Sequence, residues 1–144
     1  MKIINPKLKW KPVLKTDKDP FESFEYGDRG FRKYLHNEPA IYRLRLESPA
    51  GTIKQVYIGE TATLRERVQR HKSRRKNDPY SLRKRFLKKG KIYLDTLEIE
   101  PFKINNKRYS TRSLRAESKR QLIENIMLYK ALNQGYKILN KGWK

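Results

Sequence analysis

The chain of 144 residues contains no cysteine and only two histidines. Disulfide bonds and thiolate metal sites are therefore excluded, and two histidines cannot build a histidine-rich zinc site. A metal bound by this protein is expected to be a hard cation, Mg²⁺ or Mn²⁺, held by carboxylate, phosphate and water oxygens. No small-molecule cofactor is expected.

Long apolar runs are also lacking. The first six residues show no apolar segment typical of a signal peptide, and no stretch is long enough to span a membrane. We therefore expect a protein with no membrane partner, in the cytoplasm of a bacterial or phage-infected cell. An apolar fraction of 36% beside a charged fraction of 35% indicates one domain with a thin core.

Acidic residues are scarce: 36 Lys and Arg face 15 Asp and Glu, which gives a net charge of +21. The surplus is uneven, with nine basic and six acidic residues in 1–38 but thirteen and two in 65–91. Such a surplus predicts a polyanionic partner and binding that weakens with salt. Nucleic acid is favoured over an anionic membrane surface, because no amphipathic helix here has a long apolar face.

A β-hairpin is predicted in the first half of the chain. Residues 41–46 alternate apolar and basic side chains, which is typical of a half-buried strand. A second strand over 53–58 follows a turn at 48–52. The register that we expect places Tyr42 opposite Tyr57 on one face of the hairpin.

Two basic helices are predicted after this hairpin. Residues 63–66 fit a capping box, which predicts that the first helix starts there. Arg67 and His71 are four residues apart and share a face of this helix. The second helix is predicted over 80–89.

The remaining chain predicts a small α/β (α+β) fold, in which helices flank a three-stranded antiparallel or mixed sheet. Residues 1–38 are interpreted as an irregular lead-in that packs on a domain formed by 39–144. The later elements are expected to be a strand over 91–100, a polar loop over 104–112, a helix over 113–132 and an extended tail over 136–140.

Glu124 is the candidate carboxylate for chemistry on a phosphodiester. That reaction needs an activated water, a cation near the non-bridging oxygens and stabilisation of the leaving oxygen. Glu124 has apolar neighbours at helical spacing, so it is expected to be partly desolvated and to attract a cation. The alternative is a boundary residue paired with an arginine such as Arg120. Glu117 lies on nearly the same stripe and competes as the carboxylate.

Arg67 and His71 alone would be ordinary phosphate-contacting residues, and Tyr42 and Tyr57 ordinary core tyrosines. Taken together, the order Tyr42, Tyr57-Ile58-Gly59, Arg67, His71, Glu124 and Asn140 resembles the GIY-YIG nuclease superfamily. The resemblance spans about residues 40–140. Its first motif reads Ala40-Ile41-Tyr42, with alanine in place of glycine. No separate DNA-recognition domain follows, so the plan is closer to compact type II restriction enzymes than to homing endonucleases.

The resemblance implies a role for each of these residues. Glu124 would hold one divalent metal, and Tyr42 would activate the attacking water with help from Tyr57. Arg67 would neutralise the phosphate, and His71 would assist by hydrogen bonding or proton transfer. An unperturbed tyrosine titrates near pH 10, so we expect the surrounding positive charge to favour its phenolate.

The sequence thus predicts a Mg²⁺-dependent endonuclease acting on DNA, most readily the double-stranded form. A non-catalytic basic binding module and an RNA-directed nuclease stay as alternatives, and pairing into a homodimer is left open. The residues expected to contact nucleic acid are Arg65, Arg70, Lys72, Arg74, Arg75, Arg83, Arg85, Lys107, Arg108 and Asn140.

Overall fold

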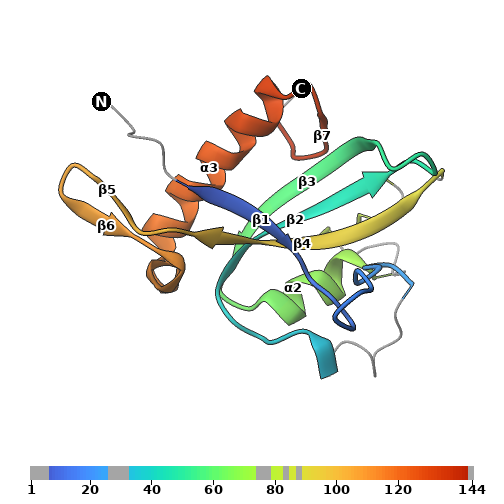
Figure 1. Ribbon diagram of the computed structural model, residues 1–144, viewed down its shortest axis with the longest axis horizontal. Coiled ribbons are helices and arrows are strands. Elements are labelled where there is room, and N and C mark those ends of the chain that lie inside the picture. Colours follow the sequence, from blue (N-terminus) through green and yellow to red (C-terminus); the bar gives the residue numbers. More distant parts are fainter. Residues whose placement is uncertain (1–6, 26–32, 74–78, 83–84, 87–88, 143–144) are drawn as a thin grey trace.

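The computed structural model describes residues 7–25, 33–73, 79–82, 85–86 and 89–142. Its centre is a five-stranded sheet in the order β1-β4-β2-β3-β7, in which only the pairing of β3 with β7 is parallel (Figure 1). The predicted α/β class with a mixed sheet is confirmed. The elements are β1 (Leu8–Pro12), β2 (Ala40–Glu47), β3 (Ile53–Thr61), α2 (Leu64–His71), β4 (Lys91–Ile99), β5 (Phe102–Ile104), β6 (Lys107–Tyr109), the 3₁₀ helix η1 (Thr111–Arg115), α3 (Glu117–Asn133) and β7 (Lys137–Ile138).

Helices α2 and α3 cover opposite faces of the sheet. The alternation in β2 sends Tyr42 and Leu44 into a core cluster with Val68 of α2, whereas Ile41 joins a cluster with Ile123 of α3. The sheet is therefore buried on both faces where β2 and β3 pair. Within the described ranges, no helix is long and apolar enough to cross a membrane.

The sheet has five strands rather than the expected three. β1 lies inside the segment interpreted as an irregular lead-in, and it pairs antiparallel with β4. Leu8 and Trp10 are half-buried while Lys9 and Lys11 are exposed, so the alternation of a strand is present. Five residues that end in a proline are too short for this pattern to stand out. The extended tail contributes the fifth strand, β7.

Three other predictions about the elements need correction. Residues 102–109 form the hairpin β5–β6 instead of a polar loop, and the last helix begins at Glu117 after the separate turn η1. The predicted second basic helix is not helical in the parts of 80–89 that the structure describes. Helix α2 does start after Thr63, but the side chain of Thr63 makes no capping hydrogen bond. The backbone N–H of Glu66 donates instead to Oδ1 of Asn37 at 3.3 Å.

The β2–β3 register places Tyr42 opposite Gly59, two residues away from the predicted pairing with Tyr57. A bulge between Leu46 and Glu47 shifts the pairing. An even shift leaves every side chain on its face, so the rings of Tyr42 and Tyr57 still lie together, 6.3 Å apart. A Cβ atom on Gly59 would lie 2.5 Å from the hydroxyl oxygen of Tyr42. The glycine is therefore required by the close approach of the tyrosine ring.

Replacing Gly59 with alanine is expected to lower the free energy of unfolding by about 2 kcal/mol, the usual cost of overpacking a core. Urea unfolding measures this loss. Alanine at Lys54, an exposed position on the same strand, serves as the control. If the clash is the cause, Gly59→Ala will cost less in a Tyr42→Ala background, where the ring is absent. Equal costs in both backgrounds would contradict this explanation.

Candidate active site

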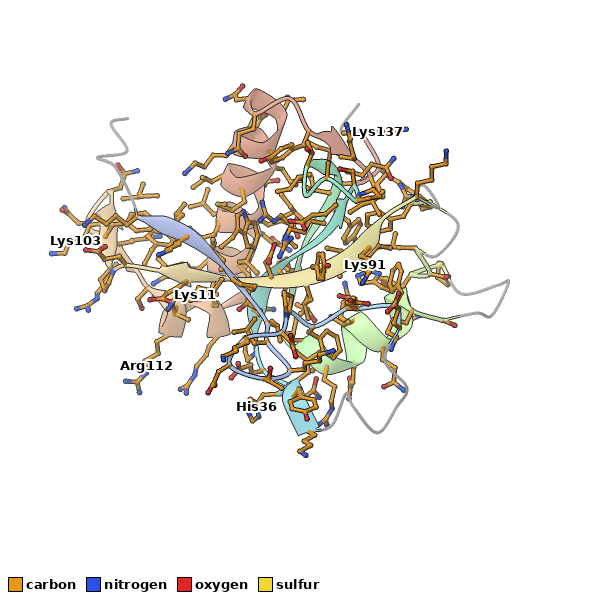
Figure 2. The ribbon with its side chains drawn as sticks, turned by 45° about the vertical axis from the view of Figure 1, so that its right-hand side comes forward. Lys11, His36, Lys91, Lys103, Arg112 and Lys137 are labelled. Atoms are coloured by element: carbon orange, nitrogen blue, oxygen red, sulfur yellow. The ribbon has the colours of Figure 1, made fainter. Side chains whose placement is uncertain are left out.

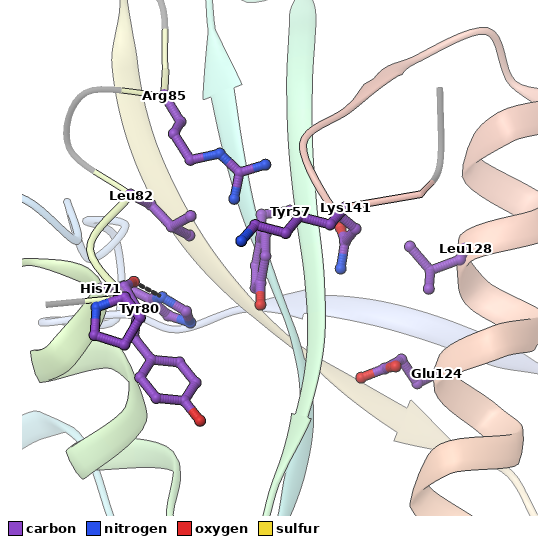
Figure 3. Close-up of a pocket in the computed structure, with 10 residues that line it drawn as sticks. Tyr57, His71, Tyr80, Leu82, Arg85, Glu124, Leu128 and Lys141 are labelled. Carbon is purple, nitrogen blue, oxygen red and sulfur yellow. Dashed lines mark hydrogen bonds between the residues drawn. The ribbon is translucent and has the colours of Figure 1, made fainter.

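A cavity of about 300 Å³ lies where α2, β3 and α3 meet the segment that follows β7. Figure 3 shows that Tyr57 of β3, His71 of α2 and Glu124 of α3 turn their polar groups toward it. Three stretches that are distant in sequence therefore share one site. Its lining comprises Tyr57, His71, Pro79, Tyr80, Leu82, Arg85, Glu124, Leu128, Asn140 and Lys141.

His71 is buried and holds hydrogen bonds at both ring nitrogens. Its Nδ1 lies 2.7 Å from the carbonyl oxygen of Tyr80 (Figure 3), and its Nε2 lies 2.6 Å from the hydroxyl of Tyr42. A carbonyl only accepts, so Nδ1 carries the proton and donates it. The Nε2 of the neutral ring is then an acceptor, and the hydroxyl of Tyr42 donates to it. The carbonyl of Tyr80 thus fixes the tautomer in which His71 can accept a further proton.

Tyr57, not Tyr42, presents its hydroxyl to the cavity. Tyr42 is fully buried and is absent from the lining, so its hydroxyl does not face the cavity. Burial raises the pKa of Tyr42 well above 10, and the guanidinium of Arg67 opposes this only in part. Burial also raises the pKa of Tyr57, again against Arg67. The expected preference for a phenolate is therefore wrong, because desolvation outweighs the nearby positive charge.

Arg67 is held beside the tyrosines by Tyr80, a residue that sequence reasoning missed. The guanidinium groups of Arg67 and Arg70 lie 4.7 and 3.9 Å from the centre of the Tyr80 ring. Each distance is typical of a cation–π contact. Tyr80 therefore orients His71 through its backbone and two arginines through its ring. A basic stretch with a single tyrosine was the available signal, but it did not reveal which arginines stack.

Glu124 is a half-buried carboxylate on the cavity wall. Desolvation raises its pKa, and the negative charge of Glu60 adds to this, whereas the backbone N–H of Glu60 and the charge of Arg67 lower it. The alternative pairing of Glu124 with Arg120 does not occur, because Arg120 Nε donates to Glu60 at 2.7 Å. Glu117 is exposed, accepts a hydrogen bond from Gln121 and lies outside the cavity.

One carboxylate facing a cavity suits a cation that is held mainly by its substrate. In the part of the chain that the structure describes, no three His, Asp or Glu side chains gather as a metal site. Mg²⁺ is usually bound by one or two carboxylates together with waters and phosphate oxygens. Glu124 fits that role, since its carboxylate is desolvated and no arginine of the described residues donates a hydrogen bond to it.

The residues predicted to contact nucleic acid do not all lie on a free surface. Arg70, Lys107 and Arg108 are exposed and Arg65 is half-exposed, whereas Arg74, Arg75 and Arg83 lie outside the described residues. The remaining three are committed to the fold. Lys72 is buried, Arg85 lines the cavity and donates to the carbonyl of Leu139, and Asn140 pairs with the backbone of Ile58, whose N–H donates to its Oδ1 at 3.0 Å.

Changing Glu124 to glutamine is expected to stabilise the metal-free protein at neutral pH. A raised folded pKa means that the charged form is disfavoured, so the wild type loses stability as pH rises through that pKa. The variant should melt about 2 °C higher at pH 7, with the difference vanishing at low pH where Glu124 is protonated. Thermal unfolding across pH measures this. Glu117→Gln, an exposed change on the same helix, is the matched control, and an equal shift for both variants would contradict the desolvation of Glu124.

No family model, no curated protein and no solved structure matches the chain. What this site can do is therefore inferred from its own geometry and chemistry.

Proposed function

We propose that the protein is a metal-dependent endonuclease that hydrolyses phosphodiester bonds in DNA. The observation that supports this most directly is the buried hydrogen bond from Tyr42 to a neutral His71 beside a cavity that Tyr57 and Glu124 share. The order of residues that resembles the GIY-YIG nucleases agrees with this chemistry. We place the activity in the cytoplasm of a bacterial or phage-infected cell, where DNA is accessible to it.

The tyrosines and His71 provide a path for the proton of the attacking water. The ring centres of Tyr57 and Tyr42 lie 6.3 Å apart, and we propose that the hydroxyl of Tyr57 donates to that of Tyr42 when a substrate is bound. The water transfers its proton to the oxygen of Tyr57 as Tyr57 passes its own to Tyr42 and Tyr42 passes its own to Nε2 of His71. Neither tyrosine becomes a phenolate, and the proton rests on an imidazole. This path is compatible with the raised pKa values of both phenols, because neither phenol has to ionise. The proton ends on a neutral imidazole, which is a stronger base than a neutral phenol hydroxyl.

Arg67 and Glu124 would stabilise the negative charge of the phosphate. The guanidinium of Arg67 lowers the pKa of Tyr42, of Tyr57 and of Glu124, so it lies near all three and can neutralise a non-bridging oxygen. Glu124 would hold Mg²⁺ or Mn²⁺, which supplies Lewis-acid stabilisation to the leaving 3′-oxygen. Tyr57 at the start of the proposed proton path and the carboxylate of Glu124 line the same cavity, which is compatible with a displacement at phosphorus.

The net charge of +21 supports a nucleic-acid substrate without distinguishing DNA from RNA. A binding module without activity would use the same charge, but it would need neither a desolvated carboxylate nor a histidine held in one tautomer. Desolvated titratable groups that line a cavity occur more often at functional sites than at purely structural positions. We therefore favour the enzyme over the module.

Glu124→Gln is expected to abolish Mg²⁺-dependent nicking of plasmid DNA, by at least about 10²-fold in single-turnover rate, while DNA binding persists. The cause is loss of the carboxylate charge that holds the metal. Gel-based cleavage and mobility-shift assays measure the two properties separately, and Glu117→Gln should cleave as the wild type does. Cleavage by Glu124→Gln at the wild-type rate rejects the assignment, and a wild type that nicks neither DNA nor RNA with any divalent metal rejects the enzyme.

Tyr42→Phe is expected to slow single-turnover cleavage by about 10² to 10⁴-fold, although Tyr42 lies outside the cavity, because it interrupts the proton path. Tyr129→Phe, at an exposed position on α3, is the control. A Tyr42→Phe variant with the wild-type rate would exclude the relay.

A further inference from the structure

The hairpin β5–β6 projects beyond the end of the main sheet (Figure 1). Asn105 and Asn106 form its turn with φ values of 49° and 64°. Two consecutive residues with positive φ are typical of a type I′ turn, whose twist matches that of the strands. The rings of Phe102 and Tyr109 stack across the strands, with centres 5.4 Å apart and planes 17° apart. The projection is therefore a defined two-stranded ribbon.

This ribbon carries positive charge that no described acidic side chain neutralises. Residues 101–116 contain five basic residues and no Asp or Glu. Lys103, Lys107 and Arg108 are exposed on the ribbon, and no described carboxylate forms an ion pair with any of the three. Figure 2 shows Lys103 and Arg112 directed away from the fold at this end of the molecule. The ribbon thus offers positive charge and hydrogen-bond donors to a partner.

The base of the ribbon is fixed to the elements that carry the candidate site. Lys119 Nζ of α3 donates to the carbonyl of Arg108 at 2.8 Å and lies over the ring of Tyr109. The buried Arg120 donates from Nη1 to the carbonyl of Leu114 in η1, and from Nε to Glu60 of β3. Movement of the ribbon relative to β3 and α3 would break these contacts.

The ribbon also lies within reach of the position where cutting would occur. Lys119 precedes Glu124 by five residues on α3, which corresponds to about 7.5 Å along the helix axis. That distance is about two base-pair steps of duplex DNA at 3.4 Å each. The three-residue strands of the ribbon extend about 10 Å farther, at 3.3 Å per residue. A duplex held at the cavity can therefore present its neighbouring bases to the tip.

We propose that the β5–β6 ribbon enters the major groove of duplex DNA and reads base edges beside the scissile phosphate. This rests on the proposed function, because it takes DNA as the partner. The major groove is about 12 Å wide and admits a two-stranded ribbon without distortion of the duplex, whereas the minor groove of B-DNA is only about 6 Å wide. Asn106, exposed at the tip, carries the donor and acceptor that match an adenine edge. Double-stranded RNA is disfavoured, since its major groove is deep and narrow.

A chemical nuclease attached at the tip of the ribbon tests this placement. The chain has no cysteine, so Asn106→Cys provides one attachment point for an iron–EDTA reagent. Ala50→Cys, exposed in the β2–β3 turn at the opposite end of the sheet, is the matched control (Figure 1). Both variants carry Glu124→Gln, so that enzymatic cutting does not obscure the pattern. They are studied as complexes with duplex DNA that mobility shift has verified.

The proposal expects radical scission of both strands from position 106, with the stagger between strands that marks the major groove, and none from position 50. Scission from neither position, equal scission from both, or a minor-groove stagger overturns it. If unlabelled protein cleaves DNA while the probe at 106 gives no scission, the proposed function stands and only the ribbon assignment fails. If no complex with DNA forms at all, both fail.

Removal of the ribbon's charge gives an independent measurement. Lys103→Gln, Lys107→Gln and Arg108→Gln together should weaken duplex binding at least about tenfold more than three changes elsewhere, by losing contacts as well as net charge. Lys18→Gln, Lys54→Gln and Lys130→Gln, all at exposed positions, form the control of equal charge. Equal losses for the two triple variants would mean that the ribbon supplies only net charge, which overturns the proposal.

Discussion

The candidate site depends on one buried contact, the hydrogen bond from the hydroxyl of Tyr42 to Nε2 of His71. Burying both groups is tolerable only because each satisfies the other, since an unpaired polar group in a core costs about 1 to 3 kcal/mol. The contact constrains its surroundings in turn. Gly59 leaves room for the phenol, and the carbonyl of Tyr80 holds the ring in the required tautomer. The glycine at position 59, the tautomer of His71 and the register of β2 against β3 are therefore all tied to this one hydrogen bond.

Two acidic residues show how the same charge can serve a structural end or a functional one. Asp95 is buried, and its Oδ2 accepts from Nε of Arg43 at 2.9 Å and from Nε of Arg45 at 2.8 Å. That carboxylate is neutralised within the fold and holds β2 against β4. Glu124 is less buried and has no such partner, so it keeps a capacity to bind a cation. The degree of compensation, rather than burial alone, separates a structural acid from a candidate functional one.

Periodicity and spacing predicted the β2–β3 hairpin, the start of α2 and the long helix. The resemblance to the GIY-YIG nucleases implied the grouping of Tyr57, His71 and Glu124, which do line one cavity. Periodicity and spacing failed where contacts between distant segments determine the local structure. The alternation in β1 is too brief to register without β4 beside it, and the bulge after Leu46 leaves no mark in the sequence. Tyr80 acts partly through its backbone carbonyl, a group that every residue has, so this role could not be predicted from the residue type. The burial of Tyr42 is a property of the packed sheet and not of its neighbours in sequence.

The segment after α3 closes the cavity from the far end of the chain. β7 adds to β3 in parallel, the N–H of Leu139 donates to the carbonyl of Val56 at 2.9 Å, and Asn140 extends the pairing with its side chain. Asn140 and Lys141 then form part of the wall. This wall depends on β3, because β7 pairs with β3 and the side chain of Asn140 pairs with the backbone of Ile58. Ile58 and Asn140 are 82 positions apart in the sequence, so the cavity is completed by a contact of high sequence separation, which costs more loop-closure entropy than a local one.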